Sequence, residues 1–494
     1  MKAAAVIGVV GAGAMGSGIA QTALAAGLDV ALFDQQPGAV EAAAERIFAR
    51  LTSEGEKGRL APDVVDRAPE KLTKASSLAD LHAADLVVEA IIERLDAKQA
   101  LFVALEAIVS SACVLATNTS SLSIAAIARG CARPERVCGM HFFNPVPVMR
   151  LVEIVRGPAT NPETLQIAHA AAKRFGKVAI DVADAPGFLV NLGGRAYYTE
   201  ALHLLQESAA DAPTIDAIMR NACGFRMGPF ELMDLTGIDV NFPVTKLIFE
   251  GYQGEPRLKT TYLHQLMVEA GRYGRKTGRG FYAYGDGDQR SVSAPQADDL
   301  RSVSFTADDR LGAGLGSILQ GYGLTPTRDP DRPILIEVFG EDAATVAIRD
   351  GLDPDRVVAM DATGVDRGTL TIMAPLGAAD VLEETRAWLA TIGYTVHVIA
   401  DTPGFVAPRM LAMIANLGCE IAQMSLASPD DIDRAMELGL NYPAGPLAIA
   451  DRMGLPTVHR ILTNLQDITG ADRYRPSLWL RQRAMLGMSA KVAR

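Results

Sequence analysis

A glycine pattern near the start of the chain constrains its fold more than any other feature. Gly11, Gly13 and Gly16 form GxGxxG between the apolar run AAAVIGVV and the alanine-rich run IAQTALAAG. The first run predicts a buried strand and the second a helix, and the glycines permit a tight turn and the close approach of a pyrophosphate. Phosphates bind the free N–H groups of a helix N-terminus, here the turn of Ala14 and Met15. The pattern therefore predicts a dinucleotide site.

The residue that ends the second expected strand indicates which dinucleotide is bound. The run DVALFD ends at Asp34, eighteen residues after Gly16. A carboxylate there accepts hydrogen bonds from the ribose hydroxyls of NAD and repels the 2′-phosphate of NADP. Gln35 and Gln36 follow, so no arginine is at hand for that phosphate. We expect NAD as the cofactor; the alternative is a glycine-rich turn without a ligand.

Composition narrows the class of protein. The chain has 494 residues, 49% hydrophobic and 21% charged, which suits a globular protein of about two to four domains. A net charge of −11, with no basic tract, argues against binding to nucleic acid. Five cysteines without CxxC spacing indicate neither a zinc site nor a disulfide framework. Without a signal-like leader or an apolar run of membrane-spanning length, a cytoplasmic location is expected, with no membrane partner.

Strand-like and helix-like segments alternate through the first 180 residues or so. This alternation predicts a doubly wound, mostly parallel sheet. Its later expected strands are 86–91, 113–120, 136–145, 151–157 and 177–184. From Pro186 the pattern changes to helices alone, over 188–208, 214–224 and 228–237.

The helical segment is repeated later in the chain. Residues 176–188 match 393–405 at an offset of 217, and the same offset pairs Asp216 with Asp433 without a gap. A copy of the helical domain is therefore expected. Residues 332–400, with four strand-like runs, predict a shortened α/β unit; its first strand is followed by a single glycine, so no second nucleotide site is expected. The expected division is 1–184 dinucleotide domain, 185–284 helical domain, 285–331 linker or adapter, 332–400 reduced α/β unit and 401–494 second helical domain.

A histidine and a glutamate stand where chemistry is expected. His141 lies at the end of an expected strand, and Glu153 follows twelve residues later. Ligands of doubly wound sheets bind at the carboxyl ends of strands. A returning strand would bring the two side chains together, so that an imidazole takes a hydroxyl proton while a carboxylate fixes its tautomer. The alternative is a structural pair.

Other polar residues near strand ends carry structural alternatives. Ser120 suits hydrogen bonding to a substrate oxygen, but it or the next serine equally suits capping of the following helix. Asn144 could instead form hydrogen bonds within its own loop, and Asn191 could simply occupy the first turn of a long helix. For Glu93 and Lys98, the residues alone favour a solvated ion pair at a helix start.

Taken together, seven motifs resemble the L-3-hydroxyacyl-CoA dehydrogenase family over about residues 4–284. The motifs are GAGAMGSGIA, VVEAIIERLDAKQALF, TNTSSLSI, HFFNPVPVMRLVEIV, DAPGFLVN, MGPFELMDLTG and GRKTGRGFY. The resemblance implies a Rossmann domain followed by a helical domain, and NAD-dependent oxidation of a (3S)-3-hydroxyacyl-CoA without a metal. It implies that His141 and Glu153 are the catalytic pair and that Ser120 and Asn191 position the substrate oxygens.

The resemblance also assigns the cofactor contacts. It implies that Glu93, Lys98 and Asn144 contact NAD, with Ser120 close by, and that Lys276 of the KTGxGFY motif lies near the nicotinamide. Lys57 is the nearest counterpart of a family lysine that contacts the coenzyme A phosphates.

The whole layout is similar to longer bacterial members of the family, described as 3-hydroxybutyryl-CoA dehydrogenases or as 3-hydroxyadipyl-CoA dehydrogenases of phenylacetate degradation. The offset places Pro408 where Asn191 stands, and the second half has neither a glycine fingerprint nor HFFNP. We expect that half to be non-catalytic. Because the helical domain of this family dimerises, we expect the two copies to form a pseudo-dimer within one chain.

Substrate choice beyond the thioester stays open in the sequence. Arg195, Arg220 and Arg226 are candidates for binding a distal carboxylate, and the alternative is that all three are solvated. Two rival functions also stay open. One is dehydrogenation of a small free hydroxy acid, and the other is an inactive protein that binds NAD.

Overall fold

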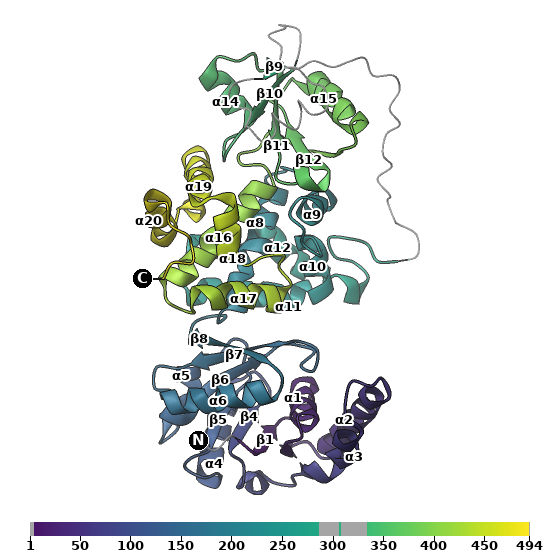
Figure 1. The fold of residues 1–494 in the computed structure, drawn as a ribbon, viewed down its shortest axis with the longest axis vertical. Coiled ribbons are helices and arrows are strands. Elements are labelled where there is room, and N and C mark those ends of the chain that lie inside the picture. The colour runs from purple at the N-terminus through teal and green to yellow at the C-terminus, as the bar shows by residue number, and fades with distance from the viewer. Residues whose placement is uncertain (1–3, 286–305, 308–332, 494) are drawn as a thin grey trace. The chain divides into compact units, whose positions relative to one another are not determined.

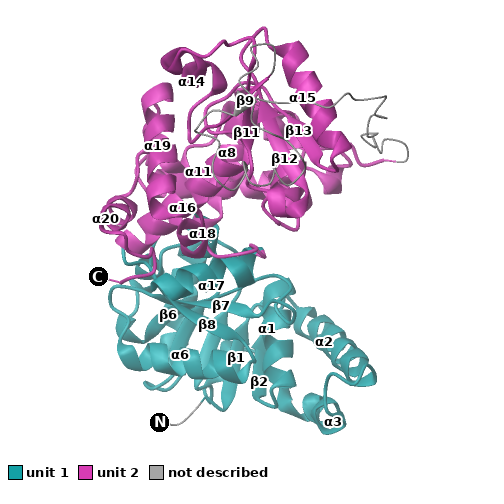
Figure 2. Ribbon diagram, turned by 45° about the horizontal axis from the view of Figure 1, so that its top comes forward, with its two compact units in different colours: residues 1–192, 424–440 teal, residues 193–423, 441–494 magenta. Residues whose placement is uncertain are grey.

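The computed structural model describes residues 4–285, 306–307 and 333–493, so most of the expected linker 285–331 lies outside the described residues. The chain forms two compact units, residues 1–192 with 424–440 and residues 193–423 with 441–494 (Figure 2). Within the described ranges, no helix combines the length and apolar character needed to cross a membrane.

The first unit is built on an eight-stranded sheet of order β3-β2-β1-β4-β5-β6-β7-β8 (Figure 1). Its strands are β1 Val6–Val10, β2 Asp29–Phe33, β3 Leu72–Lys74, β4 Leu86–Glu89, β5 Val114–Thr117, β6 Val137–Phe142, β7 Leu151–Arg156 and β8 Val178–Ala183. All neighbours are parallel except β6 and β7, which run antiparallel. The expected doubly wound sheet is confirmed, and β7 is the returning strand.

Helices link and cover these strands. They are α1 Ala14–Ala25, α2 Ala39–Glu56, α3 Pro62–Lys71, α4 Leu95–Ile108, α5 Ile124–Ala128 and α6 Pro162–Arg174. In the core, branched side chains of the strands pack against small side chains of the helices, such as Ala20 and Ala23 of α1 and Ala171 of α6. Small residues let a helix lie close to the sheet, which explains the alanine-rich run after the glycines.

The second unit contains most of the helical segments. Its elements in the first half are α8 Arg195–Gln206, α9 Ala212–Asn221, α10 Pro229–Thr236, α11 Ile238–Gly251 and α12 Tyr262–Glu269; later come α16 Ala407–Gln423, α18 Pro446–Met453, α19 Leu455–Thr469 and α20 Leu478–Leu486. The prediction of a single helix over 188–208 was wrong. It is divided into α7 Val190–Gly193 and α8, because Gly193 and Gly194 are poor helix formers.

A second sheet of order β13-β12-β11-β10-β9 also belongs to this unit. Its strands are β9 Thr306–Ala307, β10 Ile334–Glu337, β11 Val357–Asp361, β12 Thr369–Met373 and β13 Thr395–Val398, with helices α14 Ala343–Asp350 and α15 Ala379–Thr391. The four expected strands are confirmed, and β9 is an addition. As between β6 and β7, the pair β11 and β12 runs antiparallel.

The repeat extends further back than the sequence match. Helices α6 and α15 correspond residue for residue at the offset of 217. Left-handed backbone recurs at equivalent non-glycine residues, with φ of 48° at Phe188 and 58° at Phe405, and 58° at Ser208 and 55° at Ser425. The reduced unit is thus a copy of the second half of the first sheet, and it begins after the part that carries the glycine loop.

The N-terminus of α14 differs chemically from that of α1. The side chain of Asp401 accepts hydrogen bonds from the N–H groups of Ala343, at 2.7 Å, and Ala344, at 3.0 Å, while Asp342 caps the N–H of Thr345. The backbone N–H groups at the start of α14, which would otherwise bind a phosphate, are therefore already bonded to carboxylates.

Candidate active site

The glycine loop leaves room where a pyrophosphate would lie. A Cβ at Gly11 would fall 2.5 Å from the carbonyl oxygen of Ala90, and one at Gly16 would fall 1.7 Å from that of Gly11. A Cβ at Gly13 would meet no atom within 4 Å. No side chain among the described residues caps the N-terminus of α1. Free N–H groups beside an open glycine fit the diphosphate of NAD.

Asp34 follows β2 beside this loop. Its Oδ2 accepts a hydrogen bond of 2.7 Å from the N–H of Ala12, and its Oδ1 accepts one of 2.8 Å from the N–H of Gln36. These bonds fix the carboxylate next to the glycine turn, as the motif requires for contact with a ribose.

His141 and Glu153 are directly opposite each other on β6 and β7. The Nδ1 of His141 lies 2.5 Å from Oε2 of Glu153, and the glutamate side chain is fully buried. The expectation that the returning strand brings them together is confirmed. A buried carboxylate bonded to Nδ1 fixes the tautomer of the imidazole, with its proton on Nδ1 and a lone pair on Nε2.

The rest of the carboxylate is held by the backbone that precedes α7. Oε1 of Glu153 accepts hydrogen bonds from the N–H groups of Leu189, at 3.0 Å, and Val190, at 2.8 Å. The ring of His141 lies against Phe143, with centroids 4.6 Å apart. Within the described part of the chain no group bonds to Nε2, so this nitrogen is available to a substrate hydroxyl.

Ser120 and Asn191 lie close to each other. The amide of Asn191 is 3.5 Å from the carbonyl oxygen of Ser120, and Asn191 is in the first turn of α7. The alternative that Ser120 or Ser121 caps the next helix was wrong, because Ser123 caps α5 through the N–H of Ala126. The hydroxyl of Ser120 is not used by that helix.

Lys98 lies in a buried network, so the alternative of a solvated ion pair was wrong. Its side chain is 1% exposed and lies 2.5 Å from Oε1 of the fully buried Glu89 and 3.2 Å from Oε2 of Glu93. Glu93 also accepts bonds from Thr119 and from the N–H of Ser120. Burial acts to raise the pKa of Glu93, but the Thr119 hydroxyl and the Lys98 charge outweigh it and lower that pKa.

Sequence reasoning missed Glu89 and Asn118. Glu89 accepts hydrogen bonds from Lys98, from the Thr117 hydroxyl and from the N–H of Ile91. Asn118 accepts a bond of 2.8 Å from the N–H of Phe142. A charged residue inside the apolar strand LVVE was the available signal, since an acid there needs a buried partner.

The remaining predicted residues are exposed or form other ion pairs. Asn144 is exposed in the loop after β6. Lys276 belongs to the second unit, where its ammonium pairs with Asp239. Lys57 bonds to Glu54 at 3.2 Å. In the part of the chain that the structure describes, no three His, Cys, Asp or Glu side chains are grouped to hold a metal.

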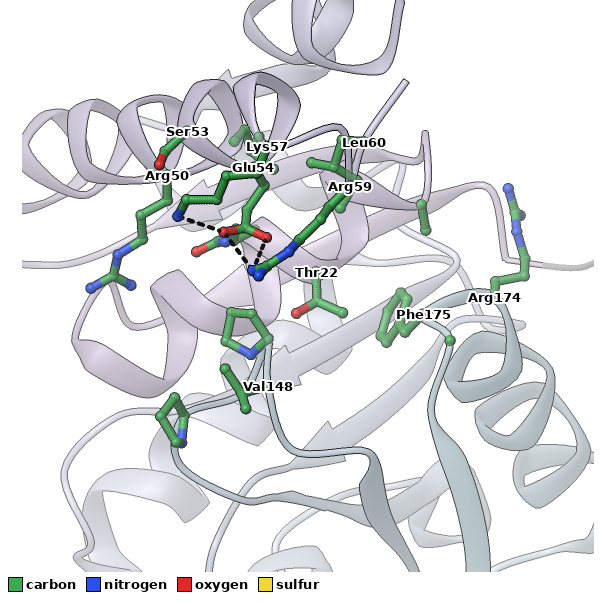
Figure 3. Close-up of a pocket in the computed structure, with 17 residues that line it drawn as sticks. Thr22, Arg50, Ser53, Glu54, Lys57, Arg59, Leu60, Val148, Arg174 and Phe175 are labelled. Atoms are coloured by element: carbon green, nitrogen blue, oxygen red, sulfur yellow. Dashed lines mark hydrogen bonds and ion pairs between the residues drawn. The ribbon is translucent and has the colours of Figure 1, made fainter. Parts of the chain in front are cut away.

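Lys57 lines a pocket of about 610 Å³ in the first unit (Figure 3). Lys57 and Arg59 both point to Glu54, whose pKa their hydrogen bonds lower. Other lining residues are Gln21, Thr22, Ala25, Ala26, Arg50, Leu51, Ser53, Leu60, Pro145, Pro147, Val148, Arg174, Phe175 and Gly176. The pocket thus combines apolar walls with several basic groups.

The three candidate arginines differ. Arg195 is buried, with its guanidinium 2.7 Å from the Thr245 hydroxyl, and burial lowers its pKa. Arg220 pairs with Glu231, and Arg226 is exposed. The alternative that all three are solvated was therefore wrong for Arg195.

A sheet with a dinucleotide-binding glycine loop and a buried histidine–glutamate pair, followed along the chain by helical segments, defines an NAD-dependent dehydrogenase. Family models match at residues 6–185, as the NAD-binding domain of 3-hydroxyacyl-CoA dehydrogenase, and at 187–284 and again 404–492, as its C-terminal domain. The chain belongs to the 3-hydroxyacyl-CoA dehydrogenase family, binds NAD and oxidises 3-hydroxyacyl-CoA.

Two relatives cover nearly the whole chain, and a third covers its first half. A 3-hydroxyadipyl-CoA dehydrogenase of Escherichia coli is 39% identical, over 97% of this chain and 97% of its own. A solved structure of a 3-hydroxybutyryl-CoA dehydrogenase from Escherichia coli matches with a TM-score of 0.88 and 38% identity, covering 98% of this chain and 99% of that one. An (S)-3-hydroxybutyryl-CoA dehydrogenase from Ralstonia eutropha is 37% identical and fully covered by 57% of this chain, with a TM-score of 0.56.

Proposed function

We propose that the chain oxidises short straight-chain (3S)-3-hydroxyacyl-CoA thioesters, with His141 as general base and Glu153 as the group that orients it. The buried pair, with Nδ1 and Oε2 2.5 Å apart, carries the proposal. Nε2 of His141 takes the proton of the 3-hydroxyl group. Glu153 keeps the proton on Nδ1 and stabilises the imidazolium that forms. NAD, when bound, accepts the hydride that leaves C3.

Ser120 and Asn191 are proposed to hold the C3 oxygen and the thioester carbonyl. The contact between them and the bond from Val190 to Glu153 support this, because they place Asn191 one residue from a group that binds the catalytic carboxylate. Reduction of a ketone uses the same groups in reverse, with His141 as the acid.

For the cofactor, we propose contacts from the glycine loop, Asp34, the Glu93–Lys98 network and Asn144, and a position near the nicotinamide for Lys276. The full proposed set is Gly11, Gly13, Ala14, Met15, Gly16, Asp34, Glu93, Lys98, Ser120, Asn144 and Lys276. The open Gly13 and the bonds that fix Asp34 support the loop contacts.

We assign the coenzyme A phosphates to the basic pocket of Figure 3. Lys57, Arg59 and Arg50 supply positive charge beside apolar walls that suit an adenine ring. Lys57→Ala would then raise KM for acyl-CoA and leave KM for NADH unchanged.

The acyl group is the finer part of the proposal. The two nearly full-length relatives are named for different substrates. The acyl group of 3-hydroxyadipyl-CoA ends in a carboxylate, and that of 3-hydroxybutyryl-CoA does not. The test is to compare kcat/KM for 3-hydroxyadipyl-CoA and 3-hydroxyhexanoyl-CoA, which match in chain length. Equal values would support a general short-chain enzyme. A preference above about tenfold for the diacid, roughly 1.4 kcal/mol, lost in Arg226→Ala, would instead assign a carboxylate site to that exposed arginine.

One assay separates the rival functions. Acetoacetyl-CoA should oxidise NADH, followed by its absorbance, and free acetoacetate should not. Turnover of the free acid would favour a hydroxy-acid dehydrogenase, and no turnover with either would favour an inactive protein that binds NAD. A role in fatty-acid or phenylacetate breakdown depends on the acyl group.

We further propose the five-part division 1–184, 185–284, 285–331, 332–400 and 401–494, with the helical copies paired within one chain as a pseudo-dimer. Packing of α8 on α16 supports the pairing, where the buried Arg409 donates to Glu200 at 2.6 Å. A cytoplasmic location suits five cysteines without CxxC spacing.

A further inference from the structure

A short segment of the second half belongs to the first unit. Residues 424–440 group with the N-terminal sheet rather than with the helices that precede and follow them (Figure 2). The N–H of Ala183, at the end of β8, donates to the carbonyl oxygen of Leu426 at 2.8 Å. Helix α17, Pro429–Leu440, then packs against β7 and β8. The second copy thus reaches the strand that carries Glu153.

The exchange is reciprocal in the second unit. At the offset of 217, the N–H of Ala400 donates to the carbonyl oxygen of Ala209 at 2.9 Å. In the second sheet, however, the offset places Leu370 where Glu153 stands, and Leu370 is buried among apolar side chains. Each copy lends a segment to the other sheet, but only the contact in the first unit adjoins a histidine–glutamate pair.

The last turn of α17 comes close to the support of that pair. A Cβ at Gly439 would lie 3.0 Å from a γ-methyl of Val190 and 3.1 Å from a δ-methyl of Leu151. These distances are shorter than ordinary van der Waals contact, so the methyl groups would have to move. Val190 is the residue whose N–H donates to Oε1 of Glu153 at 2.8 Å. One side chain and one hydrogen bond therefore separate Gly439 from the carboxylate.

We propose that the non-catalytic second copy positions the catalytic carboxylate, and that Gly439 is a positioning residue. Its bare Cα allows α17 to lie against Val190 and Leu151 without displacing the backbone donors of Glu153. The inference rests on the proposed roles of His141 and Glu153, and it gives the second half of the chain a part in the chemistry of the first.

The substitution Gly439→Ala tests this in the full chain. Because a misplaced catalytic group lowers the rate steeply with distance, kcat should fall about three- to tenfold and its pH profile should shift. KM for NADH should change less than twofold. Alanine is a better helix former than glycine, which offsets the cost of crowding the neighbouring methyl groups, so Tm should change little. A purely structural role predicts a changed Tm with an unchanged kcat and pH profile.

Two further variants separate position from stability. Arg434→Gly alters an exposed residue of the same helix, so it should lower Tm and leave kcat unchanged. Val190→Ala removes the γ-methyl groups of the residue whose N–H binds Glu153 and leaves only the contact with Leu151. Combined with Gly439→Ala, it should restore kcat close to the value of Val190→Ala alone.

The outcomes are distinct. If the unaltered chain is active and Gly439→Ala changes neither kcat nor its pH profile, the inference is overturned and the proposed function is not. An equal loss of kcat in Arg434→Gly would also overturn it, since the helix and not the contact would then matter. No turnover by the unaltered chain would overturn the proposed function and the inference with it.

Discussion

Single residues decide the chemistry, and His141 is the first to test. Its Nδ1 is bonded to a buried carboxylate, so only Nε2 is left for the substrate. In His141→Ala, kcat should fall by about two to four orders of magnitude, the usual worth of a positioned acid–base group, with NADH affinity nearly intact. Glu153→Gln keeps an acceptor for the two N–H groups but cannot stabilise an imidazolium, so kcat should fall and its pH profile should shift. Near-wild-type turnover in either variant, measured with acetoacetyl-CoA, would refute the pair.

At the same scale, Asp34 is the residue proposed to decide between cofactors. Its Oδ2 binds the N–H of Ala12, and a serine in its place retains an acceptor for that bond while removing the charge. Asp34→Ser with Gln35→Arg should therefore shift kcat/KM toward NADPH, since a guanidinium pairs with the 2′-phosphate. Equal efficiency of the unaltered chain with NADH and NADPH would contradict the role of Asp34.

Among the elements, β4 and α4 are joined by the buried pair Glu89 and Lys98. Lys98→Met leaves the carboxylate of Glu89, fully buried, without its cation. The free energy of unfolding should fall by about 3–5 kcal/mol, the usual cost of breaking such a pair. Adding Glu89→Gln removes the stranded charge and should restore part of the loss. Urea unfolding measures the stability of the single and the double variant. If Lys98→Met were as stable as the unaltered chain, the pair would not be a stabilising contact.

Elements with a strong local signal were predictable from the sequence. Strand β1, the glycine turn and α1 follow from apolar runs around GxGxxG, and the repeat at an offset of 217 predicted the second helical copy. Strand β9 was not predictable, because only two residues form it and they pair with a distant strand. The break between α7 and α8 depends on two adjacent glycines that a periodic apolar pattern masks.

The candidate site divides in the same way. His141 and Glu153 were predictable because both lie on strands joined by a short return, which fixes their register. The burial of Lys98 was not, since it depends on Glu89 of a neighbouring element, and sequence spacing alone favours a solvated pair. The close approach of Gly439 to Val190 joins residues 249 positions apart, and no local pattern reports it.

Across the whole molecule, the helical copies are joined by a buried charge pair. Arg409 and Glu200 are 0% and 1% exposed. Burial acts to raise the pKa of Glu200, but the charges of Arg409 and Arg473 outweigh it and lower that pKa to about 2. A carboxyl whose pKa is lower in the folded state contributes stability above its ordinary value of 4.5 and loses it as the pH falls toward 2.

The free energy of unfolding, measured in urea at several pH values, should therefore fall between about pH 4.5 and 2. Glu200→Gln should weaken this pH dependence and destabilise the chain at neutral pH by less than the about 3–5 kcal/mol that an unpaired buried charge costs, because Arg409 keeps a second carboxylate, that of Glu207, at 2.8 Å. An unchanged pH profile in that variant would mean that other carboxyl groups account for the acid sensitivity.

This charge pair makes the contact between the copies asymmetric. The offset of 217 places Leu192 where Arg409 stands and Leu417 where Glu200 stands. A fragment lacking residues 300–494 exposes the face of α8 that α16 covers, but pairing two such fragments through α8 would bury two Glu200 carboxylates beside leucines. We expect the fragment to aggregate rather than form a defined dimer, because an apolar patch of that size promotes association while a buried unpaired charge opposes an ordered one. Glu200→Leu in the fragment removes the charge and should yield a discrete dimer by light scattering. A soluble, fully active monomer, or a wild-type fragment that dimerises as tightly as the variant, would contradict the asymmetry.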